Sequence, residues 1–177
     1  MSLINPILTP LIKNVQNNYV CATPNIKIIP KNFPFTFIHN CVKYNSDFKN
    51  LFRALRITDS SNGSFFKNCV APELKVQKNM SDLTQIEPLI QFLLLNFNEM
   101  RKEEKKLVEI LKDLFIVPIK ENNEYALKKA CMLYDISNPI YEYLYSRNST
   151  FYPCKEFQSK KYSIFWRILG IKCEPTK

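Results

Sequence analysis

The chain contains only two glycines in 177 residues, Gly63 and Gly170, and this scarcity restricts the loops that it can form. Loops that hold a phosphate need glycine, because a β-carbon blocks the close approach of the backbone to the ligand. Two glycines so far apart cannot make up a dinucleotide-binding, P-loop or nucleophile-elbow motif. Nucleotide chemistry built on such loops is therefore excluded for this chain.

The single histidine, His39, narrows the possible chemistry further. One imidazole cannot form a multi-histidine metal site or a pair of acid–base histidines. On a strand, His39 and Cys41 would face the same side, as a base and a cysteine nucleophile would. Nothing else in the sequence completes such a site, so we expect a structural pair and keep a cysteine enzyme as a distant alternative. We predict a protein that is not an enzyme and that binds no cofactor or metal.

The six cysteines are dispersed, and no two of them form a CxxC motif. The N-terminus lacks the basic and apolar regions of a secretory signal peptide. Apolar runs are short, as at residues 92–95, whereas a bilayer span needs about 18 apolar residues. These features predict a soluble, cytoplasmic protein with reduced cysteines and no membrane partner.

The chain is basic, with a formal net charge of +9. Residues 1–60 contain 7 basic and 2 acidic residues, and residues 121–177 contain 9 and 6. The basic residues are scattered, which favours a solvated surface. Binding to nucleic acid or to another anionic surface is the alternative function that this charge leaves open.

The hydrophobic pattern predicts an α+β, helix-rich fold of about five helices. Short β segments are expected near 19–29, around a turn that contains Pro24, and a small hairpin is expected near 115–128. Apolar residues at helical spacing predict helices at 46–57, 81–99, 107–114, 135–145 and 161–169. The second and third of these form a predicted αα-hairpin.

The signals for helix ends and breaks are local. We expect a polar loop over 59–64 that contains Gly63, followed by irregular structure or short helical turns over 65–79 because of Pro72. Asp135 or Ser137 is the expected N-cap of the helix at 135–145. Gly170 stands where a left-handed residue ends a helix.

Three parts of the chain are expected from this pattern. Residues 1–18 form an N-terminal arm that is partly disordered. Residues 19–80 form a first unit with one clear helix, and residues 81–177 hold the helical hairpin, the β-hairpin and the C-terminal helices. Tyr141, Tyr143 and Tyr145 alternate around a predicted helix, so one or two of them should be exposed and able to contact a partner. The others are expected to pack against Phe151 and Trp166.

Short motifs follow one another in a distinctive order through residues 115–172. They are Ile116-Val117-Pro118, Met132-Leu133-Tyr134-Asp135, Phe151-Tyr152-Pro153-Cys154-Lys155-Glu156-Phe157 and Arg167-Ile168-Leu169-Gly170-Ile171-Lys172. In this order they resemble the closing part of a sacsin repeat. An earlier motif, Phe48-Lys49-Asn50-Leu51-Phe52-Arg53-Ala54-Leu55-Arg56-Ile57, is similar to another recurring sacsin unit. The resemblance covers roughly residues 19–172.

Two departures from the sacsin pattern occur: Ile136 follows Asp135 where the family has proline, and Arg56 replaces a glycine. The glycine motifs of the family's ATPase head cannot be placed on this chain. The resemblance therefore implies the C-terminal stalk part of a repeat, as a fragment or a reduced paralogue. It also implies a co-chaperone that acts in protein folding and quality control as a scaffold, with client or chaperone proteins as partners.

Overall fold

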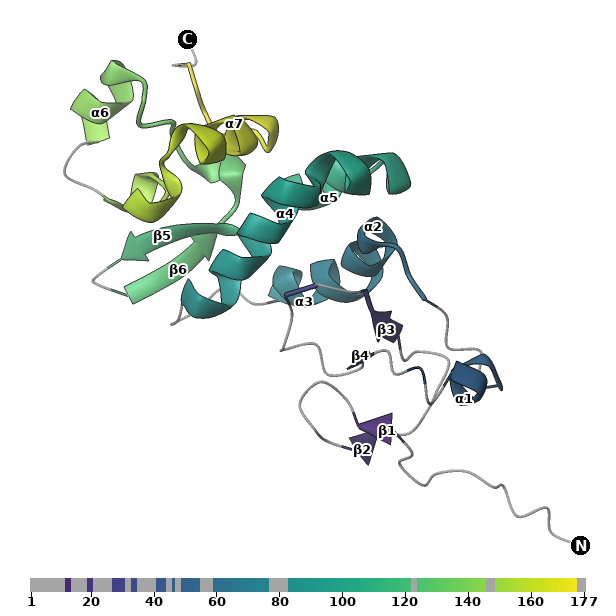
Figure 1. Cartoon of the computed structure of the whole chain (residues 1–177). Helices are drawn as coiled ribbons and strands as arrows, with labels where there is room; N and C mark the ends of the chain where they lie inside the picture. The colour runs from purple at the N-terminus through teal and green to yellow at the C-terminus, as the bar shows by residue number, and fades with distance from the viewer. Residues whose placement is uncertain are drawn as a thin grey trace, which may run out of the picture.

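The structure is a computed structural model of the chain, shown in Figure 1. The residues that it describes are 12–13, 19–20, 27–30, 33–34, 41–43, 46, 49–54, 59–76, 83–121, 124–145 and 149–174. Helices predominate and strands are short, which confirms the α+β, helix-rich class. Within these residues no helix has the length and apolar character that a bilayer span requires.

The two β segments expected around Pro24 do not pair with each other; each pairs with another strand. Strand β2 (Tyr19–Val20) pairs antiparallel with β1 (Ile12–Lys13), which lies in the predicted arm. Strand β3 (Lys27–Ile29) instead pairs in parallel with β4 (Cys41–Lys43). Alternating apolar residues identify a strand but not its partner, so the sequence predicted β segments near 19–29 and left their partners open.

Helix α1 (Lys49–Ala54) lies within the range predicted for the first helix. Its Phe52 is buried, as the helical spacing requires. Residues 55–58, with the unusual Arg56, lie outside the described part of the chain.

The predicted loop at 59–64 is wrong from Asn62 on, because a helical segment begins there. Of the two alternatives expected for 65–79, the described residues up to Val76 form short helical turns and not irregular structure. The helical segment comprises α2 (Asn62–Phe65), the π-helical turn η2 (Phe66–Val70) and α3 (Ala71–Val76). The Ser61 hydroxyl caps the segment by accepting from Ser64 N at 3.4 Å. Pro72 directly follows the wide π turn. The burial of four apolar side chains stabilises the helical segment by more than the proline destabilises it; they are Phe65, Phe66, Val70 and Leu74.

Gly63 lies in this helical segment and not in a loop. A β-carbon at Gly63 would lie 2.8 Å from the carbonyl oxygen of Met100. Gly63 N also donates to Glu103 Oε2 at 2.8 Å. The glycine is therefore needed where α2 and the end of the long helix α4 (Leu83–Glu103) approach closely.

Helix α4 is longer than the predicted 81–99 and carries Pro88 near its start. A turn at Glu104 leads to α5 (Leu107–Lys112), so the charged stretch is partly helix and partly turn. The predicted hairpin follows as β5 (Val117–Glu121) and β6 (Glu124–Lys128), paired antiparallel with Val117 opposite Lys128.

The C-terminal helices are α6 (Pro139–Tyr145) and α7 (Lys160–Ile168). Three short 3₁₀ turns, η3 (Ala130–Met132), η4 (Ser149–Phe151) and η5 (Lys155–Phe157), connect the hairpin to them. Asn138 caps α6, with Oδ1 accepting from Ile140 N at 3.0 Å, and it replaces the expected cap at Asp135 or Ser137. Gly170 ends α7 with a φ of 93°, as predicted.

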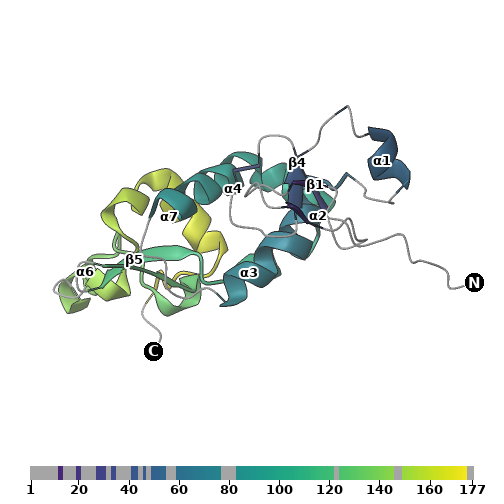
Figure 2. The same cartoon turned by 90° about the horizontal axis from the view of Figure 1, so that it is seen from below.

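Helix α4 runs between the two ends of the molecule, with α6 at one end and α1 at the other (Figure 2). Its Phe92 contacts Phe33 with ring centroids 4.5 Å apart, and its Phe97 contacts Phe165 of α7 at 5.4 Å. These contacts join both ends into one apolar core. The α6 end is thus anchored through α7 and α4.

Candidate functional site

Helix α6 rests on a cluster of aromatic rings, which we call the aromatic platform. It consists of Tyr134, Tyr141, Tyr145, Phe151 and Tyr152. Tyr134 stacks on Tyr145 with centroids 4.7 Å apart and meets Tyr141 at 4.6 Å. Tyr145 meets Phe151 at 4.9 Å, and the buried Tyr152 hydroxyl donates to the carbonyl of Tyr141. These contacts fix the orientation of α6.

The three predicted partner-binding tyrosines have separate positions. Tyr141 is buried in the platform and Tyr145 is half-buried there. Tyr145 packs on Phe151, as expected, and no contact between these tyrosines and Trp166 occurs among the described ring contacts. Tyr143 points into solvent with 86% of its surface exposed. Of these three tyrosines, only Tyr143 is therefore available to a partner.

Two apolar residues that the sequence did not single out lie beside Tyr143. Ile140 is 52% exposed and Leu144 is 58% exposed. Positions 140, 143 and 144 have the i, i+3, i+4 spacing of one helix face. We call these three residues the α6 face. The spacing was visible in the sequence, but their exposure depends on which face of α6 covers the platform.

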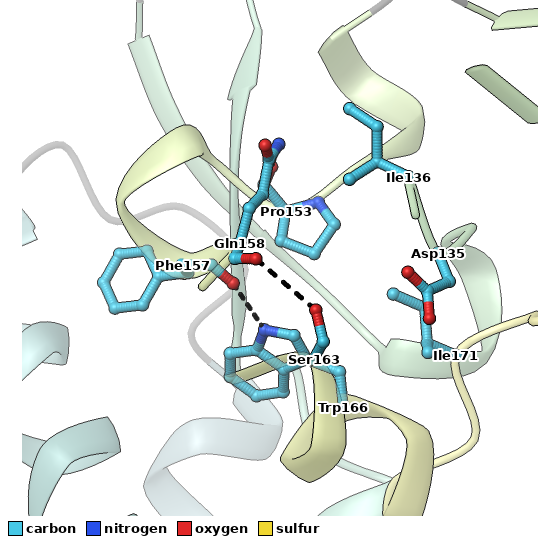
Figure 3. A pocket seen from close by; sticks show the side chains of 8 residues that line it. All are labelled: Asp135, Ile136, Pro153, Phe157, Gln158, Ser163, Trp166 and Ile171. Atoms are coloured by element: carbon cyan, nitrogen blue, oxygen red, sulfur yellow. Dashed lines mark hydrogen bonds between the residues drawn. The ribbon is translucent and has the colours of Figure 1, made fainter. Parts of the chain in front are cut away.

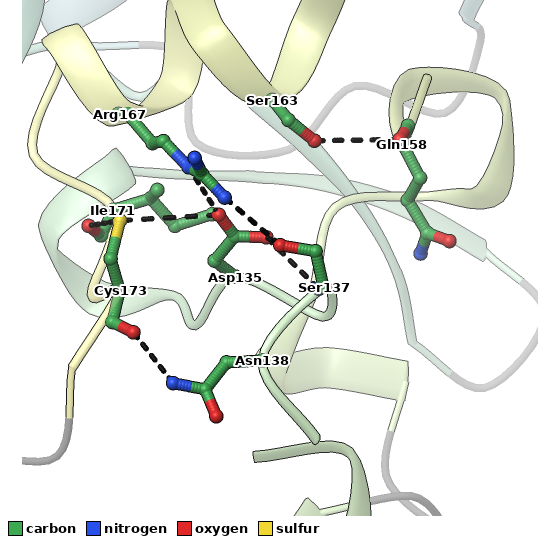
Figure 4. A network of polar contacts seen from close by, with 8 residues as sticks. All are labelled: Asp135, Ser137, Asn138, Gln158, Ser163, Arg167, Ile171 and Cys173. Atoms are coloured by element: carbon green, nitrogen blue, oxygen red, sulfur yellow. Dashed lines mark hydrogen bonds and ion pairs between the residues drawn. The ribbon is translucent and has the colours of Figure 1, made fainter. Parts of the chain in front are cut away.

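A polar network fastens the segment before α6 to the C-terminal helix (Figure 4). Asp135 is 3% exposed and accepts from Arg167 Nε at 2.6 Å, Ser137 N at 3.0 Å and Ser137 Oγ at 2.7 Å. Asn138 Nδ2 donates to the carbonyl of Cys173 at 2.7 Å. Burial alone would raise the pKa of Asp135, but hydrogen bonds from Ser137 and Arg167 outweigh burial and lower it.

The backbone reinforces this connection. Asp135 N donates to the Lys172 carbonyl at 2.9 Å, and Lys172 N donates to the Leu133 carbonyl at 3.0 Å. The Lys172 ammonium lies 4.8 Å from the ring centre of Tyr134. The charged network and the aromatic platform therefore hold α6 from adjacent sides.

A pocket next to the network is lined by Asp135, Ile136, Pro153, Phe157, Gln158, Ser163, Trp166 and Ile171 (Figure 3). Its free space of about 10 Å³ has room for about one water molecule, far less than a small-molecule site offers. Trp166 Nε1 already donates to the Phe157 carbonyl at 3.0 Å, and Gln158 Nε2 donates to the Pro153 carbonyl at 2.7 Å. The polar groups here therefore serve the packing of the chain.

The predicted cysteine–histidine pair cannot be followed as a pair, because His39 lies outside the described residues. Cys41 is buried in β4. A hydrogen bond to Cys69 and burial both raise the pKa of Cys41, so its thiol stays protonated. A cysteine nucleophile needs the opposite shift. Within the described ranges, no group of three or more metal-ligating side chains occurs.

Several scattered basic side chains pair with acids. Lys67 contacts Glu104 at 2.8 Å, and Lys75 and Lys129 both contact Asp113, at 3.3 and 2.5 Å. Helix α7 instead presents Lys160 and Lys161 to solvent beside Ile164 and Ile168. Exposed positive charge therefore lies on the helix that the Asp135 network ties to α6.

No protein-family model, curated protein or solved structure gives a significant match to the chain. The resemblance to sacsin repeats therefore depends on the motifs quoted above and stays a prediction.

Proposed function

We propose that this chain is a non-enzymatic binding domain that holds an acidic, partly apolar segment of a client or chaperone protein on the α6 face. The observation that carries the proposal is the exposure of Ile140, Tyr143 and Leu144 on a helix whose other face is fixed by the aromatic platform. A rigid helix that presents an aromatic anchor loses little entropy when it binds. This role agrees with the co-chaperone scaffold that the sacsin-like motifs imply.

The charge of the chain favours an acidic occupant. The net charge is +9. Lys160 and Lys161 are exposed on α7. Arg167 of the same helix pairs with Asp135, which lies just before α6. Complementary charge would steer an acidic chain toward this end of the molecule. An unfolded client exposes the apolar side chains that could then cover the α6 face.

The test is a titration of a fluorescently labelled, reduced and alkylated acidic protein, which stays unfolded, followed by fluorescence anisotropy. The wild type should bind it, and the variant Ile140→Ser/Tyr143→Ser/Leu144→Ser should bind at least tenfold more weakly. The matched control is Leu95→Ser, since Leu95 is 85% exposed on α4 and far from α6 in sequence. Equal binding by all three proteins would refute the proposal.

The same titration separates the alternative function. A labelled DNA duplex should bind more weakly than the unfolded protein, and the triple variant should not change DNA binding. Tight DNA binding that falls steeply between 50 and 200 mM salt, with no binding of the unfolded protein, would instead support a nucleic-acid binder.

A further inference from the structure

The pair Asn62-Gly63 begins the helical segment that packs against the end of α4, and the proposed function does not use it. It is the one Asn-Gly pair in the sequence. Asparagine before glycine is chemically labile, because no side chain on the second residue hinders the attack of its backbone nitrogen on the asparagine amide. The backbone around the pair decides whether this reaction occurs.

We propose that Asn62 is a deamidation site that the contact between α2 and α4 keeps closed, and that deamidated Asn62 prevents α2 from packing on α4 again. The attack requires the peptide between Asn62 and Gly63 to rotate toward the Asn62 side chain. Both ends of this peptide are held: the Asn62 carbonyl accepts from Phe66 N, and Gly63 N donates to Glu103 Oε2 at 2.8 Å. The folded chain therefore blocks the reaction.

The charge of Glu103 protects the site as well. The Gly63 nitrogen must lose its proton before it attacks, and a carboxylate beside it disfavours the resulting amide anion. The proton that must leave is the one that Gly63 N donates to Glu103. Protection therefore depends on a side chain of α4 and not on α2 alone.

Close packing explains why a labile pair occurs at this position. A β-carbon at Gly63 would lie 2.8 Å from the Met100 carbonyl oxygen and 3.2 Å from the β-carbon of Glu103. The end of α4 thus requires a residue without a side chain at position 63. The same absence of a side chain makes Asn62 reactive whenever the two helices separate.

The reaction needs no enzyme and consumes one water overall. The Gly63 nitrogen attacks the Asn62 side-chain carbon, so that a C–N bond forms, the bond to the amide nitrogen breaks and ammonia leaves with the proton from Gly63. Water then adds to one carbonyl of the cyclic imide, and one C–N bond of the ring breaks. The product is aspartate or isoaspartate at position 62, and no atom is oxidised or reduced.

The product does not suit the place that Asn62 occupies. Asn62 Oδ1 is buried and accepts no hydrogen bond within the described part of the chain. A carboxylate there would bury a negative charge without a donor, next to the residue that Glu103 binds. The positive end of the helix offsets only part of this cost. Deamidation would therefore leave a lasting mark on chains whose α2 has separated from α4.

The experiment incubates the full chain at mildly alkaline pH, in buffer and in concentrated urea, and follows deamidation by tryptic mapping and mass spectrometry. The tryptic peptide 57–67 contains Asn62 as its one asparagine, so its conversion from amide to acid reports this site alone. The reaction in urea should be at least about tenfold faster than in the folded chain. Equal rates, or no reaction in urea, would overturn the proposal.

Two variants test the contact with α4. Glu103→Ala removes the acceptor of Gly63 N, so deamidation in buffer should rise at least about threefold, with no change in urea. The matched control is Glu99→Ala, since Glu99 is exposed one turn earlier on α4 and should leave the rate unchanged. A rate in Glu103→Ala at or below that of the control would overturn the protective role of Glu103. The comparison of wild type in buffer and urea decides the question even if Glu103→Ala fails to fold.

Asn62→Asp reproduces one product of the reaction. It should unfold at a lower urea concentration than wild type, and Asn68→Asp, an exposed position of the same helical segment, should not. A midpoint for Asn62→Asp equal to or above that of wild type would overturn the claim that the product keeps α2 from packing on α4.

Discussion

The guanidinium of Arg167 donates to the carboxylate of Asp135 at 2.6 Å and thereby joins the last helix to the segment that leads into α6. Among the described residues, Asp135 is the one charged residue that is buried. Its other carboxylate oxygen accepts hydrogen bonds from the backbone N and the hydroxyl of Ser137. A buried carboxylate with a complete set of donors stabilises a structure only while those donors stay in place. The position of the α6 face therefore depends on this pair.

Replacing Asp135 with asparagine should lower the free energy of unfolding by about 1.5–3 kcal/mol, because the amide weakens a charge-assisted hydrogen bond in a buried site. Urea unfolding at pH 7 measures this change. The matched control is Asp113→Asn, since Asp113 is half-exposed and contacts Lys75 and Lys129 in solvent. Its effect should be clearly smaller, as for other surface ion pairs. Equal effects of the two variants would contradict the role given to Asp135.

The Asp135 contribution should also depend on pH. Its pKa is lowered in the folded chain, so the stabilisation is complete above the ordinary carboxyl pKa of about 3.9. It is lost as pH falls below that value and through the folded pKa, because the unfolded chain takes up the proton first. The difference in unfolding free energy between wild type and Asp135→Asn should be constant from pH 7 to 5 and shrink toward pH 3. A difference that stays constant down to pH 3 would count against this explanation.

Gly63→Ala should destabilise the protein by about 1–3 kcal/mol, because the new β-carbon would meet the Met100 carbonyl. Helix propensity alone predicts the opposite sign, since alanine favours a helix over glycine by about 1 kcal/mol. Thermal unfolding therefore decides between close packing and propensity.

Gly170 provides the comparison, because a β-carbon there has no neighbour within 4 Å but the φ is 93°. Asparagine, which tolerates this conformation, should be better accepted than alanine at Gly170, and neither should be accepted at Gly63.

Tyr152→Phe should loosen α6 without disturbing the rest of the core. The variant removes the hydroxyl that donates to the Tyr141 carbonyl and leaves that acceptor without its partner. The expected loss is about 1 kcal/mol in unfolding free energy, with faster hydrogen exchange confined to the amides of α6. The control is Tyr162→Phe on α7, which should leave exchange in α6 unchanged. Unaltered exchange in α6 of Tyr152→Phe would mean that the platform does not fix this helix.

Local patterns in the sequence predict the hairpin of β5 and β6, the helix α7 and the role of Gly170, because each depends on neighbouring residues. The sequence left 65–79 open between irregular structure and short helical turns because Pro72 is a local breaker, whereas buried side chains from distant elements decide the outcome. The pairing of β3 with β4 and the contact between Arg167 and Asp135 join residues distant in sequence. Such contacts depend on the whole fold and leave no signal in one sequence.

The site shows the same limit. The tyrosine pattern on α6 predicted an exposed aromatic residue, and Tyr143 is that residue. The sequence could not show that Tyr141 and Tyr145 face inward, because this depends on Tyr134 and Phe151 from other segments. It also gave no reason to include Ile140 and Leu144, since apolar residues at helical spacing usually face the core.

Site-specific photo-cross-linking tests the α6 face most directly. Benzoylphenylalanine would replace Tyr143 in one protein and the equally exposed Leu95 in another, and each would be illuminated with the labelled, unfolded acidic protein. Position 143 should give a strong cross-link, competed by excess unlabelled protein, and position 95 should give only background. Equal cross-linking from both positions, or cross-linking from position 95 alone, would contradict the claim that the α6 face is the binding surface.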